Sequence, residues 1–220
     1  AQFIPAAVQQ GAAAILYQTG HAVELGDAIG IEVPNVRLAL AKMAAAHVGK
    51  QPAHLMAVTG TNGKTSIAEF CRQLWQLTGH DAASLGTLGL SSEHAALNAS
   101  VPANNTSADP VLLAQTLGKL ADTEIDYVAL EASSHGLDQY RLDGVHIESA
   151  AFTNLTHDHL DYHPTMDDYF AAKARLFTEL PLSSNTVWIN ADDAYGKKLM
   201  SLAKGAGRVV KTFGKAGDDI

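Results

Sequence analysis

The strongest indication of the fold is the segment Val58-Thr59-Gly60-Thr61-Asn62-Gly63-Lys64-Thr65. A short apolar run, residues 55–59, predicts a strand before the glycines, and residues 65–78 predict a helix after them. A glycine-rich turn between a strand and a helix can direct backbone N–H groups at a phosphate, and the helix N-terminus favours negative charge. We therefore predict a phosphate-binding loop in which Lys64 reaches the β- and γ-phosphates and Thr65 is a ligand of Mg²⁺.

This loop departs at one position from the strict pattern of phosphate-binding loops, G-x-x-x-x-G-K-[ST]. The pattern requires glycine at position 58, where the chain has Val58. The alternative is a plain glycine-rich turn that carries an exposed lysine. The order strand, loop, helix favours the phosphate-binding interpretation.

From residue 54 onward, short apolar runs alternate with helical patterns. Further strands are expected at 84–88, 127–130, 149–153, 186–190 and 208–213, and further helices at 109–120, at 166–180 and between the last two strands. This alternation predicts an α/β fold with a mostly parallel sheet of the phosphate-loop type, covered by helices on both faces. Ligands of such sheets bind at the carboxyl ends of the strands.

The first fifty residues form a separate zone. They predict a helix at 5–10, strands at 13–17 and 29–33, and a helix that begins after Asn35 and ends near 47–49. Residues 49–52 are a plausible linker. Because this zone is thin for an independent fold, we expect residues 1–50 to be the truncated end of a small α/β domain and residues 51–220 to be a larger one.

Composition excludes several classes of protein. The 220 residues carry a formal net charge of −8 and are 47% hydrophobic, which allows a sizeable core and argues against binding to a nucleic-acid backbone. The single cysteine, Cys71, cannot form an internal disulfide. Residues 1–23 lack charged side chains, but Pro5, Gly11 and Gly20 interrupt them too often for a membrane-spanning helix. We therefore expect a cytoplasmic protein with no nucleic-acid or membrane partner.

Glu131 ends the apolar run 127–130 and falls at the carboxyl edge of the expected sheet. A carboxylate at this edge can hold Mg²⁺ opposite a phosphate-binding loop. The alternative is a solvated or helix-capping glutamate. The neighbouring phosphate-binding loop favours the interpretation of Glu131 as a metal ligand.

A cluster of histidine and aspartate follows the strand expected at 149–153. Within residues 157–163, HDHLDYH, three histidines and two aspartates occur in seven positions. Neutral histidine is a common metal ligand. We expect one or two of these side chains to be functional and the others to cap the loop.

Lys173 occupies an apolar helix face. Its neighbours three and four positions away are Tyr169, Phe170, Leu176 and Phe177. Burial lowers the pKa of an amine, and a neutral amine can take up CO₂ as a carbamate that binds a metal. The alternative is a lysine that extends along the apolar face to reach solvent.

Four motifs in this order closely resemble those of the Mur ligases, above all the branch that adds the third residue of the peptidoglycan stem peptide. They are residues 59–65, TGTNGKT; 131–137, EASSHGL; 153–163, TNLTHDHLDYH; and 190–193, NADD. The resemblance implies an ATP-dependent amide ligase in which ATP phosphorylates a carboxylate of UDP-MurNAc-L-Ala-D-Glu. The amine of meso-diaminopimelate or L-lysine then attacks the acyl phosphate. It further implies a cytoplasmic monomer with Mg²⁺ as cofactor.

The resemblance also implies roles for individual residues. ATP would be bound by Gly60, Thr61, Asn62, Gly63, Lys64, Thr65 and Asn190. Mg²⁺ would be held by Thr65, Glu131, His159 and Lys173, with Lys64, His159 and a carbamylated Lys173 as catalytic residues. The muramoyl-dipeptide would contact Thr106, Ser107, Ser133, Gln139 and Arg141. Residues 105–110, NTSADP, depart from the usual Thr-Thr-Pro-Asp-Pro of the family and lack one of its prolines.

By the same resemblance, residues 1–50 would be the remnant of the domain that binds the UDP portion, and residues 51–220 would be the central ATP-binding domain without its full C-terminal end. We expect such a fragment to be inactive alone. Three alternatives stay open. One is a metal-dependent hydrolase built on residues 157–163, although Tyr162 breaks the H-x-H-x-D-H spacing. Another is a non-catalytic nucleotide-binding module, and the third is a related ligase that acts on folate or adds D-Ala-D-Ala.

Overall fold

The computed structural model describes residues 3–21, 23–98, 107–158, 161–216 and 219. Its main unit is a seven-stranded sheet in the order β5-β4-β6-β3-β7-β8-β9, in which β5 is antiparallel to β4 and the other neighbours are parallel. The strands are β3 (His54–Thr59), β4 (Ala82–Gly86), β5 (Gly89–Ser91), β6 (Tyr127–Glu131), β7 (Ile147–Phe152), β8 (Leu182–Asn190) and β9 (Val209–Phe213). The predicted α/β fold with a mostly parallel sheet is confirmed.

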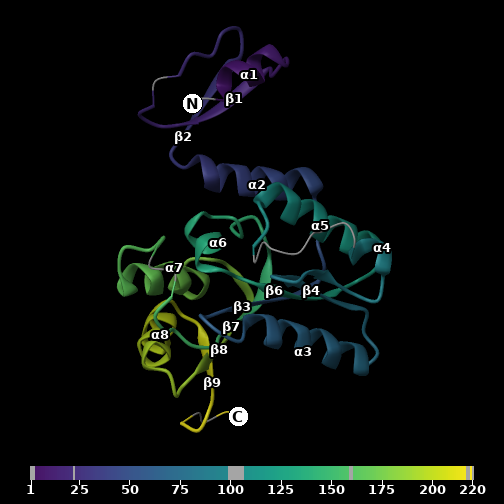
Figure 1. Ribbon diagram of the computed structural model, residues 1–220, viewed down its shortest axis with the longest axis vertical. Coiled ribbons are helices and arrows are strands. Elements are labelled where there is room, and N and C mark those ends of the chain that lie inside the picture. Colours follow the sequence, from purple (N-terminus) through teal and green to yellow (C-terminus); the bar gives the residue numbers. More distant parts are fainter. Residues whose placement is uncertain (1–2, 22, 99–106, 159–160, 217–218, 220) are drawn as a thin grey trace.

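Helices cover both faces of this sheet (Figure 1), with α3 and α5 on opposite sides. They are α3 (Lys64–Leu77), α4 (Ala95–Asn98), α5 (Pro110–Asp122), α6 (Ser134–Asp138), α7 (Met166–Thr178) and α8 (Ala194–Gly205). Four of them begin at a side-chain cap that accepts hydrogen bonds from free N–H groups of the first turn: Asp109 for α5, Ser133 for α6, Thr165 for α7 and Asp193 for α8.

The core lies between the sheet and its helices. Leu55, Ala57 and Val58 of the central strand β3 are fully buried, as expected for a parallel strand with both faces covered. Phe152 at the end of β7 and Phe177 of α7 pack edge to face, with ring centroids 6.3 Å apart. This packing fixes α7 against the carboxyl end of the sheet.

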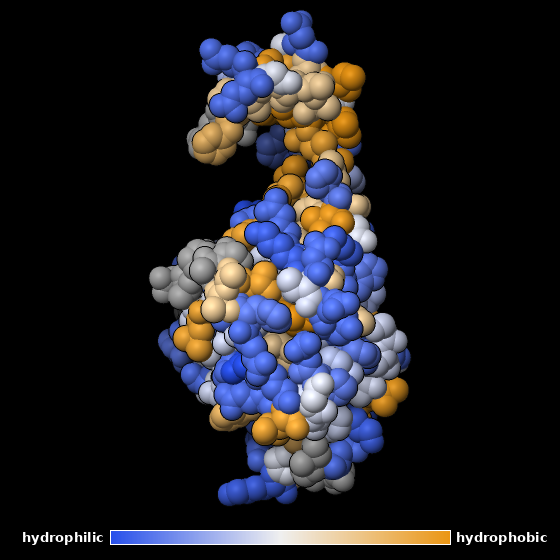
Figure 2. Space-filling model, turned by 90° about the vertical axis from the view of Figure 1, so that its right-hand side faces the viewer, coloured by the Kyte–Doolittle hydropathy of each residue, from blue (hydrophilic) through white to orange (hydrophobic). Residues whose placement is uncertain are grey.

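The N-terminal residues form a small unit beside the main one. Helix α1 (Ile4–Gln9) accompanies two parallel strands, β1 (Ala14–Gln18) and β2 (Ile29–Val33). Figure 2 shows this unit joined to the main body by a narrow neck. The next helix, α2 (Val36–Val48), packs on α5 of the main unit, although it precedes the expected boundary at residue 50. The division of the chain at residue 50 itself stays a prediction.

Two glycines allow the close packing of α2. A Cβ atom at Gly144 would overlap the backbone carbonyl of Ala41, and one at Gly118 would overlap the side chain of Val48. Helix α2 is therefore held between α5 and the segment that precedes β7.

The strand expected at 84–88 differs from the one observed, because β4 ends at Gly86 and the chain turns back into β5. The turn is stabilised by the carboxylate of Glu131, which accepts a hydrogen bond from the backbone N–H of Thr87 at 2.9 Å. Gly89 has a φ of +84°, a conformation that favours glycine. The short helices α4 and α6 were not predicted. In the described part of the chain, no helix is both long and apolar enough to cross a bilayer.

Candidate functional site

Several of the predicted site residues in the described part of the chain lie at the carboxyl ends of three adjacent strands. Strand β3 lies between β6 and β7, with Val58 opposite Glu131 and Thr59 opposite Phe152. The loop after β3, the carboxylate that ends β6 and the segment after β7 therefore lie at one edge of the sheet. This is the edge at which parallel α/β sheets bind ligands.

The loop at 60–63 has a conformation that requires glycine. Gly60 has a φ of +146° and Gly63 a φ of +85°. A Cβ atom at Gly60 would also overlap the side chain of Thr153. Helix α3 begins directly after Gly63, so its first N–H groups face the loop.

Residues 153–156, which follow β7, hold the loop in place. The N–H of Thr61 donates to the carbonyl of Asn154 at 2.8 Å. The hydroxyl of Thr153 donates to the carbonyl of Asn62 at 2.7 Å, and the N–H of Thr156 donates to Oγ1 of Thr61 at 3.0 Å. The loop is thus fixed by a neighbouring strand as well as by its own helix.

Two lysines share one carbonyl of this loop. Nζ of Lys64 donates to the carbonyls of Gly60 and Thr61 at 3.0 and 2.9 Å, and Nζ of Lys173 donates to the carbonyl of Gly60 at 2.9 Å. Burial lowers the pKa of Lys64, and burial followed by the charge of Lys64 holds the pKa of Lys173 well below its usual value. Lys173 is only 1% exposed, so the alternative in which it reaches solvent is wrong.

Tyr169 supports both the loop and Lys173, although the sequence did not single it out as a site residue. Its buried ring lies 4.6 Å from Nζ of Lys173, and its hydroxyl lies 3.2 Å from Oγ1 of Thr61. Burial raises the pKa of Tyr169. The signal available in the sequence was its position one helical turn before Lys173.

Glu131 is 2% exposed and lies close to the loop. Its carboxylate accepts hydrogen bonds from the N–H and the hydroxyl of Thr87 at 2.9 and 3.2 Å, and its charge raises the pKa of Lys64. Thr65 is the second residue of α3 and is half-buried. Glu131 and Thr65 offer carboxylate and hydroxyl oxygens, the kind of donor that Mg²⁺ prefers.

Four of the five residues predicted to contact the dipeptide substrate form one hydrogen-bonded cluster near the carboxyl end of β6. The hydroxyl of Ser107 accepts from the N–H of Ser133 at 3.0 Å and donates to the carbonyl of Glu131 at 3.2 Å. The guanidinium of Arg141 donates to the carbonyl of Ser107 at 2.6 Å and to Oε1 of Gln139 at 2.8 Å. Thr106, the fifth, lies outside the described residues.

Asn190 joins the ends of two strands. Its Nδ2 donates to the carbonyl of Thr153 at 2.8 Å, so the end of β8 is tied to the end of β7 beside the loop. The carboxylate of Asp193 caps α8 and also accepts from the N–H of Leu155 at 3.2 Å. Asn190 therefore lies next to the segment that holds the loop.

The residues of the 157–163 cluster have separate environments. His163 is buried, with its ring 5.2 Å from that of Tyr169, whereas His157 and Asp158 are exposed. The charge of Asp158 raises the pKa of Lys64 and of Lys173, a contribution that the sequence did not reveal. His159 lies outside the described residues. Among the residues that are described, no three His, Cys, Asp or Glu side chains are grouped to hold a metal.

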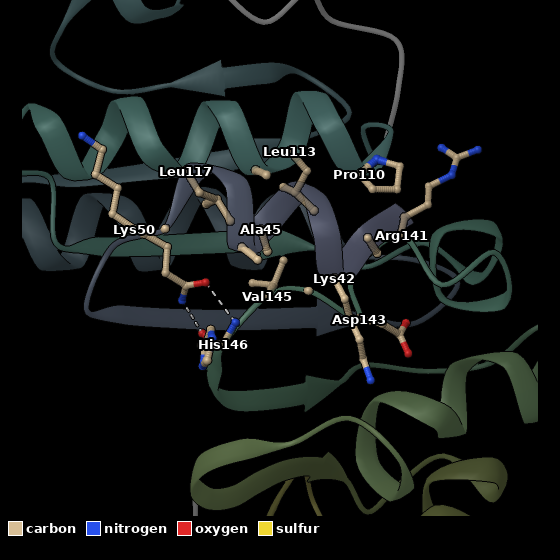
Figure 3. A pocket seen from close by; sticks show the side chains of 16 residues that line it. Lys42, Ala45, Lys50, Pro110, Leu113, Leu117, Arg141, Asp143, Val145 and His146 are labelled. Carbon is tan, nitrogen blue, oxygen red and sulfur yellow. Dashed lines mark hydrogen bonds between the residues drawn. The ribbon is translucent and has the colours of Figure 1, made fainter. Parts of the chain in front are cut away.

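A cavity of about 480 Å³ lies apart from the loop, between α2, α5 and residues 141–146. Figure 3 shows its apolar floor, including Leu113, Leu117 and Val145, with Lys50 and His146 at one end and Pro110 and Arg141 at the other. Gln51 fixes one wall through two hydrogen bonds to the backbone of His146. Of the predicted site residues that the structure describes, only Arg141 lines this cavity.

Comparison with protein families decides the assignment, because residues 58–220 match the Mur ligase middle domain. The chain belongs to the Mur ligase family. This membership decides against the metal-dependent hydrolase that the histidine cluster had left open, because the match includes the loop, Glu131 and Lys173 in one domain.

Curated members of the family are similar to this chain over almost its entire length. It is 46% identical over 221 residues to the UDP-N-acetylmuramoyl-L-alanyl-D-glutamate–2,6-diaminopimelate ligase of Agrobacterium fabrum, covering 99% of this chain and 43% of that protein. It is 44% identical over 220 residues to the ligase of the same name from Rhizobium meliloti, covering 100% and 44%. The chain thus spans less than half the length of these Mur ligases.

Solved structures show the same relationship. A structure of UDP-N-acetylmuramoyl-L-alanyl-D-glutamate–2,6-diaminopimelate ligase superposes with a TM-score of 0.82 at 32% identity, covering 99% of this chain and 44% of that one. A folylpolyglutamate synthase from Mycobacterium tuberculosis, complexed with ADP, superposes with a TM-score of 0.62 at 17% identity, covering 80% and 45%. The second likeness shows a shared fold alone.

Proposed function

We propose that this Mur ligase chain provides the nucleotide-binding site of an ATP-dependent ligase that joins 2,6-diaminopimelate to UDP-MurNAc-L-Ala-D-Glu in the cytoplasm, and that it acts as a monomer. The observation that carries the proposal is the carbonyl of Gly60, which accepts hydrogen bonds from Lys64 and Lys173 in a loop opposite Glu131. The names of the curated relatives favour diaminopimelate over lysine as the amino acid.

The loop would bind the triphosphate through its backbone N–H groups and the N-terminus of α3. Lys64 would exchange its two carbonyl partners for the γ-phosphoryl oxygens, where its charge offsets the charge that develops during transfer. Asn190 would contact the nucleoside end. Positioning and charge neutralisation are the main requirements of this reaction.

Lys173 would act as a carbamate. Burial and the charge of Lys64 hold the pKa of the Lys173 amine well below its usual value, which favours the neutral form that reacts with CO₂. The amine nitrogen attacks the carbon of CO₂ and loses a proton, which leaves a carbamate anion. The change replaces a positive charge beside Lys64 with a negative one and removes the repulsion between the two amines.

Glu131, Thr65, His159 and the carbamate of Lys173 would hold Mg²⁺. The described members of this set fit a hard cation, since they supply carboxylate and hydroxyl oxygens at the edge of the sheet. When bound, Mg²⁺ would neutralise charge on the phosphate oxygens. Thr87 would keep the Glu131 carboxylate in position through its two hydrogen bonds.

Thr106, Ser107, Ser133, Gln139 and Arg141 would orient the dipeptide end of the other substrate. A carboxylate oxygen of D-Glu attacks the γ-phosphorus of ATP, the bond to ADP breaks, and an acyl phosphate forms. The amine of diaminopimelate then attacks the acyl carbon, loses a proton and displaces inorganic phosphate. Arg141 is suited to hold the substrate because its planar guanidinium can bind a carboxylate through two hydrogen bonds.

Direct binding tests this proposal. Calorimetric titration of the purified protein with a non-hydrolysable ATP analogue and Mg²⁺ should show one site, and Lys64→Met should weaken it at least tenfold while the thermal midpoint of unfolding stays within a few degrees. A separate titration with UDP-MurNAc-L-Ala-D-Glu should also show one site. If the parent protein binds neither ligand, the proposed function is wrong.

A further inference from the structure

A second cavity, of about 320 Å³, opens where the start of α2 meets the start of α5 and the residues that follow α6. It is lined by Arg37, Leu40, Asp109, Pro110, Gln139 and Arg141. Gln139 and Arg141 belong to the predicted substrate cluster, so this cavity adjoins the proposed dipeptide site. Arg37 was not predicted to have any role.

The lining carries an excess of positive charge. Arg141 donates hydrogen bonds only to neutral groups among the described residues, the carbonyl of Ser107 and the side-chain amide of Gln139. The carboxylate of Asp109 caps α5, where Oδ1 accepts from the first N–H groups of that helix at 3.0 and 3.1 Å. The lining therefore includes two arginines and one aspartate, whose carboxylate already has partners.

Arg37 occupies a position that the helix itself disfavours. It is the second residue of α2, which begins at the cap Asn35, and a positive charge at a helix N-terminus opposes the helix dipole. Within the described residues, the Arg37 guanidinium makes no ion pair and no hydrogen bond. A bound anion would supply the compensating charge.

We propose that Arg37 and Arg141 form a subsite for an anionic oxygen group, a phosphate or a carboxylate, of the sugar-nucleotide substrate. This inference rests on the proposed function. Leu40 supplies an apolar wall, and the two arginines come from α2 and from the segment after α6. The subsite would therefore tie the helix that follows the N-terminal unit to the substrate cluster. Arg37 contributes affinity for this substrate.

Matched variants of α2 test the assignment. Arg37→Gln removes the charge from the subsite, Arg37→Lys keeps the charge without the planar fork, and Lys42→Gln removes a charge from the same helix at a residue that lines the other cavity. By calorimetry, Arg37→Gln should weaken binding of UDP-MurNAc-L-Ala-D-Glu about tenfold or more, and Arg37→Lys should weaken it less. Lys42→Gln should retain the parent affinity, and the affinity for the ATP analogue should be unchanged in all three.

Two truncated ligands identify the anionic group. UDP-GlcNAc keeps the pyrophosphate and lacks carboxylates, whereas MurNAc-L-Ala-D-Glu keeps the carboxylates and lacks the pyrophosphate. A loss of affinity in Arg37→Gln for the first ligand identifies phosphate, and a loss for the second identifies carboxylate; either result supports the subsite.

The inference is overturned if the parent binds these ligands and Arg37→Gln loses no more affinity than Lys42→Gln. That result would leave the proposed function intact. If the parent binds neither the ATP analogue nor the sugar nucleotide, the proposed function fails and the subsite fails with it. Circular dichroism of each variant shows whether its fold matches the parent, so a loss of affinity is not mistaken for unfolding.

Discussion

Lys64 and Lys173, which lie more than a hundred positions apart in the chain, donate hydrogen bonds to the same backbone carbonyl, that of Gly60. The arrangement brings two amines together in a buried place and lowers the pKa of both. Such a pair is unfavourable for stability unless a ligand uses it. The convergence therefore points to function at the end of β3.

Replacing Lys173 by methionine should separate stability from function. Methionine has a similar shape without the buried amine, so we expect the free energy of unfolding in urea to stay within about 1 kcal/mol of the parent or to rise. Calorimetric titration should nevertheless show that Mg²⁺ no longer enhances binding of the ATP analogue. A fall in stability of more than about 3 kcal/mol would show that the amine is required for folding.

Tyr169 offers a test of how the amine is supported. Tyr169→Phe keeps the ring beside Lys173 and removes only the hydroxyl that contacts Thr61, so a loss of about 1 kcal/mol is expected. Tyr169→Leu also removes the ring and should cost about 2–4 kcal/mol. Urea denaturation measures both values. Equal losses in the two variants would contradict a role for the ring.

Gly60 and Gly63 form a natural pair of test and control. Both have positive φ, but only a side chain at Gly60 would overlap Thr153. Gly63→Ala should cost about 1–2 kcal/mol through backbone strain alone. Gly60→Ala should cost more and should abolish binding of the ATP analogue. Similar effects in the two variants would show that the contact with Thr153 is unimportant.

Glu69 should make stability depend on pH in the acidic range. Hydrogen bonds from Arg72, aided by those from Gln73 and Ser84, lower the pKa of Glu69 from 4.5 to about 2. Its contribution is therefore complete above pH 4.5 and disappears as the pH falls towards 2. The difference in unfolding free energy between the parent and Glu69→Gln should shrink over this interval. A constant difference would contradict the assignment.

Local patterns predicted much of the fold, because strands and helices with strong periodicity leave a clear signal. The helix expected at 166–180 is observed as Met166–Thr178, and the buried face of Lys173 followed from its neighbours along that helix. The five-residue helix α6 and the turn after Gly86 left no such signal, since their positions depend on contacts with distant residues.

For the candidate site, too, local motifs in the sequence indicated some residues, and contacts between distant segments added others. Lys64 was predicted from the glycine-rich loop and Glu131 from its position at a strand end. The contribution of Tyr169 was not, because its hydroxyl meets Thr61 across 108 positions of the chain. Arg37 was missed for a related reason, since its cavity is formed by three segments that are far apart in the sequence.

Helix α2 is packed so closely on the main unit that the two form one rigid body. Its 13 residues extend about 20 Å, and the bare backbones at Gly118 and Gly144 let it sit so close to the main unit that little slack is left. Any rotation of the β1–β2 unit relative to the main unit must therefore occur about a hinge before Asn35. Helix α2 would stay fixed to the large sheet. The distance between two fluorophores placed on either side of that hinge would report the rotation directly, whereas the distance between a pair on α2 and α5 would stay constant.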